Sequence, residues 1–349
     1  MNLTKPAPIG PPATSRRGMV DALLPVAVAI ATGLLCWIGT GALIPILRRR
    51  DVFDHPNARS SHRVPTPRGG GIAVTGAVLL AWLAVYRTGS VTTGLISVSL
   101  GTGVLAAVSW VDDLRGLSPG IRLLAQLIAV TIGILTLPEA HNRLEAWLSP
   151  TLYFVGLGAL WIWWINLFNF MDGIDGLATS EAAAVGGGLL LFATIGVGED
   201  PAAALCAAGL LGAAIGFLWW NWSPAQIFLG DVGSVPVGYL SGFLLLGLAA
   251  RGYWKIALIL PLYFLADATI TLLQRLLRGQ RVWQAHRQHF YQQAVRDGLD
   301  HGTVVKRVIV ADLLLIGCGW VAENGGGAIA LGVAVAIVAV LLAALARGR

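Results

Sequence analysis

Four polar segments carry side chains of the kinds that bind metal ions and phosphate groups: Asp112–Asp113, Asn169–Asp175, Asp231 and His286–His289. Mg²⁺ takes oxygen ligands such as carboxylates, and Arg side chains form charge-assisted hydrogen bonds to phosphate. Two adjacent carboxylates repel each other by about 4 kcal/mol at about 4 Å and an effective dielectric constant of about 20. We therefore expect a cation or a shared proton beside Asp112 and Asp113. A solvated helix end is the competing interpretation of this pair alone.

The second and third segments place acids among glycines. Asp172 and Asp175 are three residues apart and share a face if their segment is helical. Gly173 and Gly176 would let a ligand approach the backbone closely, although a loop with a helix cap also fits. Asp231 stands alone on an apolar loop next to the membrane, where an acid is costly unless it is paired or binds metal. The pattern favours Asp231 as a metal ligand.

The fourth segment combines His286, Arg287 and His289, with the two histidines at helical i, i+3 spacing. This set suits a phosphate-rich ligand better than Mg²⁺, which prefers oxygen. An ordinary amphipathic helix at the membrane surface is the alternative. Arg68 lies near the end of a basic loop, residues 54–71, that is rich in Pro and Gly. This loop could cap the same site, which makes Arg68 a candidate for substrate binding, or it could be a rigid connector.

The elements that must position these residues are membrane helices. The chain is 56% hydrophobic and 12% charged, with a mean hydropathy of +0.73, whereas roughly a quarter of the residues of a soluble protein are charged. A membrane-spanning helix needs about 20 mostly apolar residues. The sequence predicts an all-α, polytopic membrane bundle of about eleven spans, or ten if a short one is re-entrant. The spans are Ala22–Leu47, Gly70–Tyr86, Val91–Trp110, Ile121–Leu137, Thr151–Phe168, Leu177–Val197, Ala202–Trp220, Val235–Ala250, Tyr253–Leu273, Thr303–Ala322 and Gly327–Leu345.

Basic residues alternate between the two sides of this predicted bundle. Residues 1–21 are predicted to be a disordered tail, and residues 22–349 form one transmembrane domain with catalytic loops. Because cytoplasmic loops carry the excess of Lys and Arg, the richer side is predicted to be cytoplasmic, and helix counting places all four polar segments there. That side holds Arg48, Arg49, Arg50, Arg59, Arg63, Arg68, Arg115, Arg122, Arg275, Arg278, Arg281, Arg287, Arg296, Lys306, Arg307, Arg347 and Arg349. The opposite loops hold only Arg87, Arg143, Arg251 and Lys255, besides Lys5, Arg16 and Arg17 in the tail.

The net charge of +6 and the pI near 9.6 therefore reflect the basic loops on one side of the predicted membrane bundle. They do not indicate a nucleic-acid partner, because the basic residues are divided among membrane loops and form no continuous surface. Three acids fall inside predicted spans: Asp267, which is expected to face the bundle interior, and Glu181 and Asp312 near the cytoplasmic ends. The three cysteines also lie inside spans and are expected to be buried small hydrophobic residues.

Together these residues suggest a chemistry. Carboxylates, glycines and basic residues at one membrane surface are what a Mg²⁺-dependent phosphoryl transfer requires. The metal, with Mn²⁺ as a possible substitute, would neutralise a diphosphate, the basic groups would hold it, and a membrane groove would bind a lipid acceptor.

The chain resembles the polyprenyl-phosphate N-acetylhexosamine-1-phosphate transferases of glycosyltransferase family 4, which include peptidoglycan translocase I and the enzymes that initiate O-antigen synthesis. The resemblance covers roughly Arg48 to Arg296, and the motifs are specific in combination. They are the Asp112-Asp113 pair, NFMDGIDGLA from Asn169 to Ala178, FLGDVGS from Phe228 to Ser234, Asp267 followed by Arg275, and a last loop with histidines.

The resemblance implies transfer of a sugar 1-phosphate from a UDP-sugar to undecaprenyl phosphate, with release of UMP, at the cytoplasmic face of a bacterial inner membrane. It implies that Asp231, with Asp112, binds Mg²⁺, and that Asp112 or Asp113 positions or deprotonates the lipid phosphate. Asn169, Asp172 and Asp175 would hold the nucleotide and the metal. His286, Arg287 and His289 would hold the diphosphate and sugar. These residues leave open whether transfer is direct or passes through a covalent intermediate, and they leave oligomeric state open.

Two departures bear on the substrate. Gly116 stands where translocase I has a Lys, and the last loop has HRQH in place of three histidines. These departures argue against the peptidoglycan substrate. Three segments look more like the O-antigen-initiating branch, whose donors include UDP-GlcNAc: DHPNARSSHRVPTPRGGG, MDGIDGLATSE with Glu181, and HRQHFYQ. A transporter or flippase is the main alternative function, but its coupling acids usually lie near the midplane in repeated halves. The motif of a third class, the CDP-alcohol phosphotransferases, is not found in the sequence.

Overall fold

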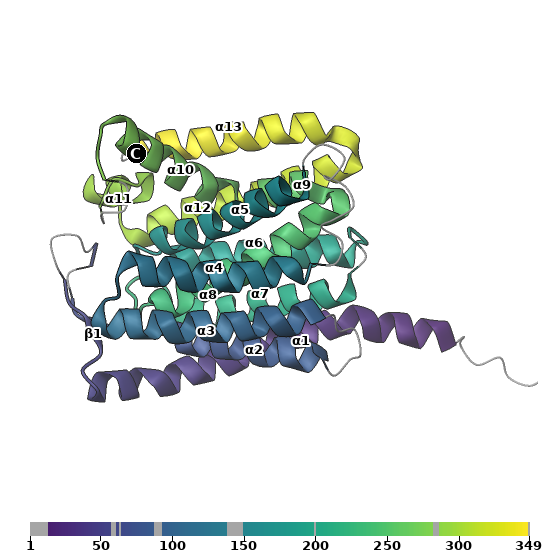
Figure 1. The fold of residues 1–349 in the computed structure, drawn as a ribbon, viewed down its shortest axis with the longest axis horizontal. Helices are drawn as coiled ribbons and strands as arrows, with labels where there is room; N and C mark the ends of the chain where they lie inside the picture. Colours follow the sequence, from purple (N-terminus) through teal and green to yellow (C-terminus); the bar gives the residue numbers. More distant parts are fainter. Residues whose placement is uncertain are drawn as a thin grey trace, which may run out of the picture.

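The computed structural model describes residues 13–56, 61–62, 64–86, 93–137, 149–198, 200–281 and 286–347. It confirms the all-α prediction. Apart from two short antiparallel strands, β1 (Phe53–Asp54) and β2 (Thr66–Pro67), the regular structure of the described residues is helical. The helices lie side by side along one direction (Figure 1). Arg59, Arg63, Arg87, Arg143 and Arg349, which support the predicted orientation, lie outside the described residues.

The helices begin where capping residues and prolines favour a start. Ser118, Ser149 and Asp200 each accept a hydrogen bond from a backbone N–H of the following first turn, and Pro follows each as the first helical residue. The helices are α1 (Ala13–Arg49), α2 (Gly71–Tyr86), α3 (Thr93–Arg115), α4 (Pro119–Leu135), α5 (Pro150–Phe170), α6 (Leu177–Thr194), α7 (Pro201–Asn221), α8 (Asp231–Leu248), α9 (Trp254–Ile259), α10 (Leu262–Leu277), α11 (Phe290–Arg296), α12 (His301–Val321) and α13 (Gly327–Ala346).

Seven helical stretches of the described chain are long and apolar enough to cross a membrane, and α2 and α4 are shorter apolar helices. One of the seven stretches, His301–Ala346, contains both of the last two predicted spans, because α12 and α13 follow each other directly across a kink at Ala322–Gly326, where Gly325 has a φ of 90°. The protein is therefore a multi-pass membrane protein. Helix α1 begins at Ala13, so it includes residues 13–21, which the sequence assigned to the tail. Residues 1–12 lie outside the described residues.

The ninth predicted span, Tyr253–Leu273, is not one continuous helix. It is divided into α9 and α10, with Pro261 between them. Proline lacks a backbone N–H, and its ring clashes with the carbonyl oxygen four residues earlier, so a helix breaks at this position. A second break precedes α9, where Gly252 has a φ of 100°, which lies outside the helical region and forms a kink after α8.

Close contacts between backbones hold the interior of the bundle together. A Cβ atom added to Gly212 of α7 would lie 2.1 Å from the carbonyl oxygen of Ala29 in α1, so only glycine fits this helix crossing. At Gly186 of α6, a Cβ atom would lie 2.9 Å from the backbone nitrogen of Leu211. Small residues allow such close approach between membrane helices. Cys36, Cys206 and Cys318 are free and buried, as predicted.

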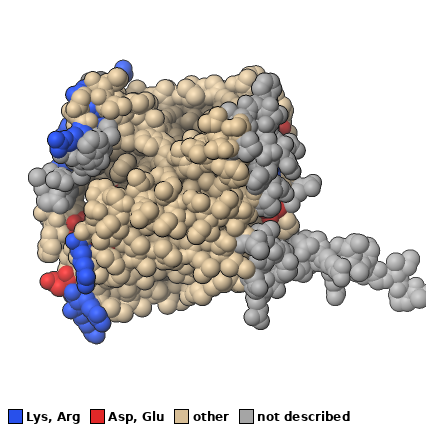
Figure 2. Space-filling model, in the orientation of Figure 1, with Lys and Arg blue, Asp and Glu red and all other residues tan. Residues whose placement is uncertain are grey.

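Charge gathers at one end of the bundle. The Lys and Arg side chains visible in Figure 2 lie mainly at its left end, where the loop after α1 and the ends of α3, α5 and α10 also lie in Figure 1. Arg48 and Arg49 lie in the last turn of α1, Arg115 in that of α3 and Arg275 in that of α10. We call this the site end of the bundle. The predicted polar segments converge there.

Candidate active site

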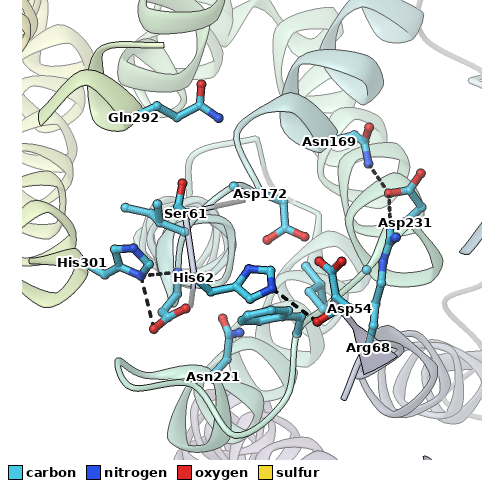
Figure 3. A pocket seen from close by; sticks show the side chains of 16 residues that line it. Asp54, Ser61, His62, Arg68, Asn169, Asp172, Asn221, Asp231, Gln292 and His301 are labelled. Carbon is cyan, nitrogen blue, oxygen red and sulfur yellow. Dashed lines mark hydrogen bonds and ion pairs between the residues drawn. The ribbon is translucent and has the colours of Figure 1, made fainter. Parts of the chain in front are cut away.

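A polar cavity of about 370 Å³ lies at the site end (Figure 3). Its walls come from the loop after α1, the loop between α5 and α6, the start of α8, and the beginnings of α11 and α12. Lining residues are Asp54, Ser61, His62, Arg68, Asn169, Asp172, Gly173, Ile174, Asp175, Asn221, Phe228, Leu229, Gly230, Asp231, Gln292 and His301. Sequence segments more than 200 residues apart thus meet in one cavity.

Arg68 and Asp113 fix the position of Asp231. The Arg68 guanidinium lies 2.6 Å from an Asp113 carboxylate oxygen and 3.0 Å from one of Asp231. The Asp113 carboxylate also accepts hydrogen bonds from the backbone N–H groups of Asp231 and Val232, at 3.0 and 2.9 Å. A carboxylate at this helix N-terminus complements the exposed amides and the helix dipole. The Asp113 side chain is 1% exposed, so it supports the N-terminus of α8, while Asp231 lines the cavity.

Glycines make this contact possible. Gly230 has a φ of 74°, and a Cβ atom there would lie 2.8 Å from an Asp113 carboxylate oxygen. A Cβ atom on Gly71 would lie 2.1 Å from the backbone nitrogen of Gly233, so α2 and α8 begin in direct contact. The N–H groups of Gly69 and Gly70 donate to the Phe228 carbonyl oxygen at 3.2 and 2.9 Å. These contacts hold the loop that carries Arg68 against the loop that carries Asp231.

Asn169 joins the end of α5 to the same carboxylate. Its Nδ2 atom donates to Asp231 at 3.0 Å and to the Ser234 hydroxyl at 2.8 Å.

A second basic residue, Arg122 near the start of α4, also approaches Asp231. Its Nη1 atom lies 3.1 Å from Asp112 and 3.8 Å from Asp231. From the sequence alone, Arg122 indicated only which side of the membrane its loop faces. Its place one helix turn after the Ser118 cap does not by itself indicate a site residue.

Asp172 and Asp175 have different surroundings, although both line the cavity. They lie in the loop between α5 and α6, so the predicted helical face is absent. The Asp172 side chain points into the cavity (Figure 3). Burial, followed by the nearby charge of Asp231, raises the pKa of Asp172 well above its ordinary value, and Arg68 opposes this shift. Asp172 is thus a carboxyl group that a bound cation would favour in its ionised form.

Asp175 instead contacts His301, the first residue of α12. The imidazole Nδ1 atom lies 3.2 Å from the carboxylate, which also accepts a hydrogen bond from the Ala225 backbone at 3.2 Å. Burial alone would raise the pKa of Asp175, but these contacts outweigh it and lower the pKa. Sequence reasoning missed His301, because a lone His at a helix start carries no pattern.

The predicted histidine segment does not line this cavity. Helix α11 begins at Phe290, so His286 and His289 precede the helix and the predicted i, i+3 helical pairing is wrong. His289 is 2% exposed and lies 3.2 Å from Asp267, while the His286 ring stacks on it with a centroid distance of 4.8 Å. Burial, followed by His289 and Arg275, lowers the pKa of His286 to about 4, so this side chain is neutral near pH 7. Arg287 is exposed at the surface.

Asp267 faces the bundle interior, as predicted. It is fully buried and accepts hydrogen bonds from the hydroxyl groups of Tyr263 and Thr271 and from the backbone N–H groups of Phe290 and Tyr291. The broken ninth span brings it within reach of the chain that leads into α11. Asp267 therefore anchors the last loop to α10.

An apolar groove of about 540 Å³ meets the polar cavity from the side. It runs between α3, α4 and α5, with Leu105, Val108 and Trp163 among its apolar residues. Asp112 and Arg122 line its polar part, and Asn169 and Asp231 line both the groove and the cavity. A ligand with a charged head and an apolar tail could therefore place its head beside Asp231 while its tail lies among membrane helices.

Similarity to known proteins points to the same chemistry. Residues 95–249 match the family model described as glycosyl transferase family 4. The chain is 30% identical to a phospho-N-acetylmuramoyl-pentapeptide-transferase of Kocuria rhizophila, over 87% of this chain and 98% of that protein. It is also 30% identical to the protein of the same name from Mycobacterium marinum, over 86% and 96% of the two chains.

A third relative has a different donor in its name. The chain is 27% identical, over 85% of its length and 83% of the relative, to a probable undecaprenyl-phosphate N-acetylglucosaminyl 1-phosphate transferase of Bacillus subtilis. All three relatives are named as transferases, and none as a transporter. With this coverage and identity, the chain belongs to glycosyl transferase family 4, as a membrane-embedded member of its polyprenyl-phosphate sugar-phosphate transferases.

Proposed function

We propose that the protein transfers an N-acetylhexosamine 1-phosphate from a UDP-sugar to undecaprenyl phosphate. An oxygen of the lipid phosphate attacks the phosphorus that bears the sugar. The bond from that phosphorus to the bridging oxygen breaks, UMP leaves, and the new P–O–P bond forms a lipid diphosphate sugar. The observation that supports this most directly is that the polar cavity and the apolar groove share Asn169 and Asp231.

Each substrate then has a compartment of matching chemistry. The polar cavity suits the nucleotide diphosphate sugar, and the groove suits the prenyl chain, with its phosphate near Arg122. Arg122 is 40% exposed and already spans Asp112 and Asp231, so a lipid phosphate could exchange for one of these carboxylates. Positioning two anions for in-line attack supplies much of the catalysis in phosphoryl transfer.

The residues of the cavity fit a Mg²⁺ ion that is shared with substrate. Among the described side chains, no three His, Cys, Asp or Glu residues converge as a closed metal site. Mg²⁺ commonly takes only one or two carboxylates and completes its shell with waters and substrate phosphates. Asp231 and Asp172 would hold such an ion, with Asp112 near the lipid side. The ion would neutralise negative charge on the diphosphate.

Arg68 and Asp113 would act on the reaction through Asp231. Their ion pair and the backbone hydrogen bonds at the start of α8 hold Asp231 in one orientation. His289 would have an indirect role as well, because it is enclosed against Asp267. Of the predicted histidine segment, exposed Arg287 and half-buried His286 are better placed to meet a sugar or diphosphate that extends out of the cavity.

We further propose that the donor carries no peptide and that the product initiates an envelope polysaccharide such as O-antigen, at the cytoplasmic face of the inner membrane. Gly116 in place of Lys and the single HRQH element support this branch. The relative from Bacillus subtilis is named for the N-acetylglucosaminyl donor, whereas the other two are named for the pentapeptide donor. The two classes of donor must therefore be compared directly.

The test is UMP release by the purified protein with undecaprenyl phosphate, Mg²⁺ and a panel of UDP-N-acetylhexosamines, alongside UDP-N-acetylmuramoyl-pentapeptide. We expect release with a peptide-free donor and its loss in Asp231→Asn. Release only with the pentapeptide donor would contradict the proposed branch. Absence of release with every donor, from protein that remains folded, would contradict the proposed reaction.

A further inference from the structure

A second apolar groove lies on the outer flank of the bundle, between α12 and α13, with a volume of about 690 Å³. It shares no lining residue with the cavity or the groove of the active site. Helix α12 contributes a stripe from Thr303 to Leu314, and α13 contributes one from Val333 to Ala344. Both stripes follow the i, i+3, i+4, i+7 spacing of a single helix face. Two antiparallel helices therefore form a continuous trough.

The trough has a polar end and an apolar end. Lys306, Arg307 and Thr303 lie at the start of α12, and every other lining residue is apolar. This polar end is the site end of the bundle, because His301, two residues before Thr303, contacts Asp175 of the active-site cavity. Basic side chains and apolar surface thus occur in the order in which a lipid presents its headgroup and its tail.

The length of the trough matches one leaflet. Eleven residues separate Thr303 from Leu314, which corresponds to about 16 Å along a helix at about 1.5 Å per residue. The hydrocarbon core of a bilayer is about 30 Å thick, so the trough spans about half of it. The trough therefore has a length that matches the acyl chains of a lipid in the leaflet at the site end. A polyprenyl chain of undecaprenyl length exceeds a half-membrane trough.

Charge selects among the lipids of that leaflet. None of the residues that line the trough is acidic, and Lys306 is exposed at its mouth. Asp300 lies nearby as the α12 cap, where its carboxylate accepts hydrogen bonds from Thr303. Lys306 therefore presents a positive charge at headgroup level. A basic residue near the membrane surface attracts anionic lipid by about 1 kcal/mol.

We propose that the α12–α13 trough is a binding site for an anionic glycerophospholipid, with its phosphate beside Lys306 and Arg307 and its acyl chains between the two helices. The site is distinct from the acceptor groove and does not depend on the reaction proposed above. Bound lipid would pack α13, a helix with a long exposed apolar face, against α12. The lipid is thereby a structural ligand at the edge of the bundle.

The test uses the whole protein in nanodiscs that contain phosphatidylglycerol and phosphatidylcholine with identical acyl chains. Native mass spectrometry measures which lipid stays bound. We expect phosphatidylglycerol to be enriched over its bulk fraction. Lys306→Gln should lower its apparent affinity about fivefold, the factor to which about 1 kcal/mol corresponds. Arg278→Gln, which removes an exposed charge at the same end but outside the trough, should leave it unchanged.

A second pair of variants tests the trough itself. Ala336 lines the trough, and Ala339 is exposed on the same helix but outside it. Ala336→Trp should displace the bound phosphatidylglycerol, whereas Ala339→Trp should not. Equal enrichment in Ala336→Trp, or equal affinity in Lys306→Gln and Arg278→Gln, would overturn the proposal. So would a two-chain complex lost only in Ala336→Trp, which would identify a second copy as the occupant, or preferential retention of undecaprenyl phosphate over phosphatidylglycerol.

Discussion

The carboxylate of Asp113 accepts a hydrogen bond from the backbone N–H group of Asp231 at 3.0 Å, although 118 residues separate them. The two acids therefore have different environments in one site. Asp113 is enclosed and bound to the start of α8, and Asp231 faces the cavity and the groove. Replacing Asp113 should therefore lower stability, whereas replacing Asp231 should lower activity and leave the fold intact.

Asp113→Ala should destabilise the protein by about 2–3 kcal/mol, because it removes a charged acceptor from two backbone N–H groups and from Arg68. The partial exposure of Arg68 keeps the loss from being larger. Thermal unfolding in detergent measures the effect, and Asp297→Ala, at an exposed ion pair, is the control. An unfolding midpoint equal to that of the control would show that Asp113 does not support α8.

Asp231→Asn should leave the fold intact and lower kcat for UMP release by at least about 100-fold, the scale for loss of one group that stabilises transition-state charge. Removing Mg²⁺ with a chelator should have the same effect and should be reversed by added Mg²⁺. Asp300→Asn, an exposed acid at the site end, serves as the control. Full activity without divalent metal would contradict the assignment of Asp231 as a metal ligand.

The acceptor groove can be filled without touching the polar cavity. Ala159 lines the groove, and its neighbour Leu160 is 62% exposed and does not line it. Ala159→Trp should raise the KM for undecaprenyl phosphate by about tenfold or more, on the scale of one or two buried methylene groups lost from contact. The KM for the UDP-sugar should change little. If Leu160→Trp has the same effect as Ala159→Trp, the lipid does not bind in this groove.

The Asp175–His301 contact predicts a pH dependence of stability. The folded-state pKa of Asp175 lies below its ordinary value, so its ionised form stabilises the folded protein. That contribution is present above the unfolded pKa of about 3.9 and is lost as the pH falls through the folded pKa. The difference in unfolding midpoint between wild type and Asp175→Asn should shrink below about pH 4. A difference that grows on acidification would have the wrong sign.

Two buried carboxyl groups, Glu181 of α6 and Asp312 of α12, predict a protonated acid inside the bundle. They are 0% and 2% exposed, and no described residue donates a hydrogen bond to any of their four carboxyl oxygens. Two unpaired charges in that environment would cost several kcal/mol. The infrared carbonyl band of a protonated carboxyl group should therefore be present at pH 7. It should weaken in the Glu181→Gln, Asp312→Asn double variant and persist in Asp300→Asn.

The helical membrane fold is predictable from the amino-acid sequence alone, because runs of about 20 apolar residues have few alternatives in a bilayer. Ten of the eleven predicted spans each coincide largely with one helix of the described residues, including the short Gly70–Tyr86 span, and the ninth is divided between α9 and α10. Basic residues and helix counting also placed Asp112, Asn169, Asp172 and Asp231 at one end. That inference depends only on the direction of successive helices, which apolar lengths determine.

Which of these residues share a cavity, and how each is paired, depends on the packing of the helices. Arg122 and His301 became site residues only because α4 and α12 begin beside Asp231 and Asp175, a long-range contact that local spacing does not encode. His289 shows the opposite case. The sequence predicted that it binds substrate, but in the fold it is enclosed against Asp267. The break at Pro261 changes the course of the ninth span, and the packing of α10 against the last loop then determines which side chains reach the cavity. Periodicity specifies a helix and its faces, whereas side-chain partners depend on how helices distant in sequence pack together.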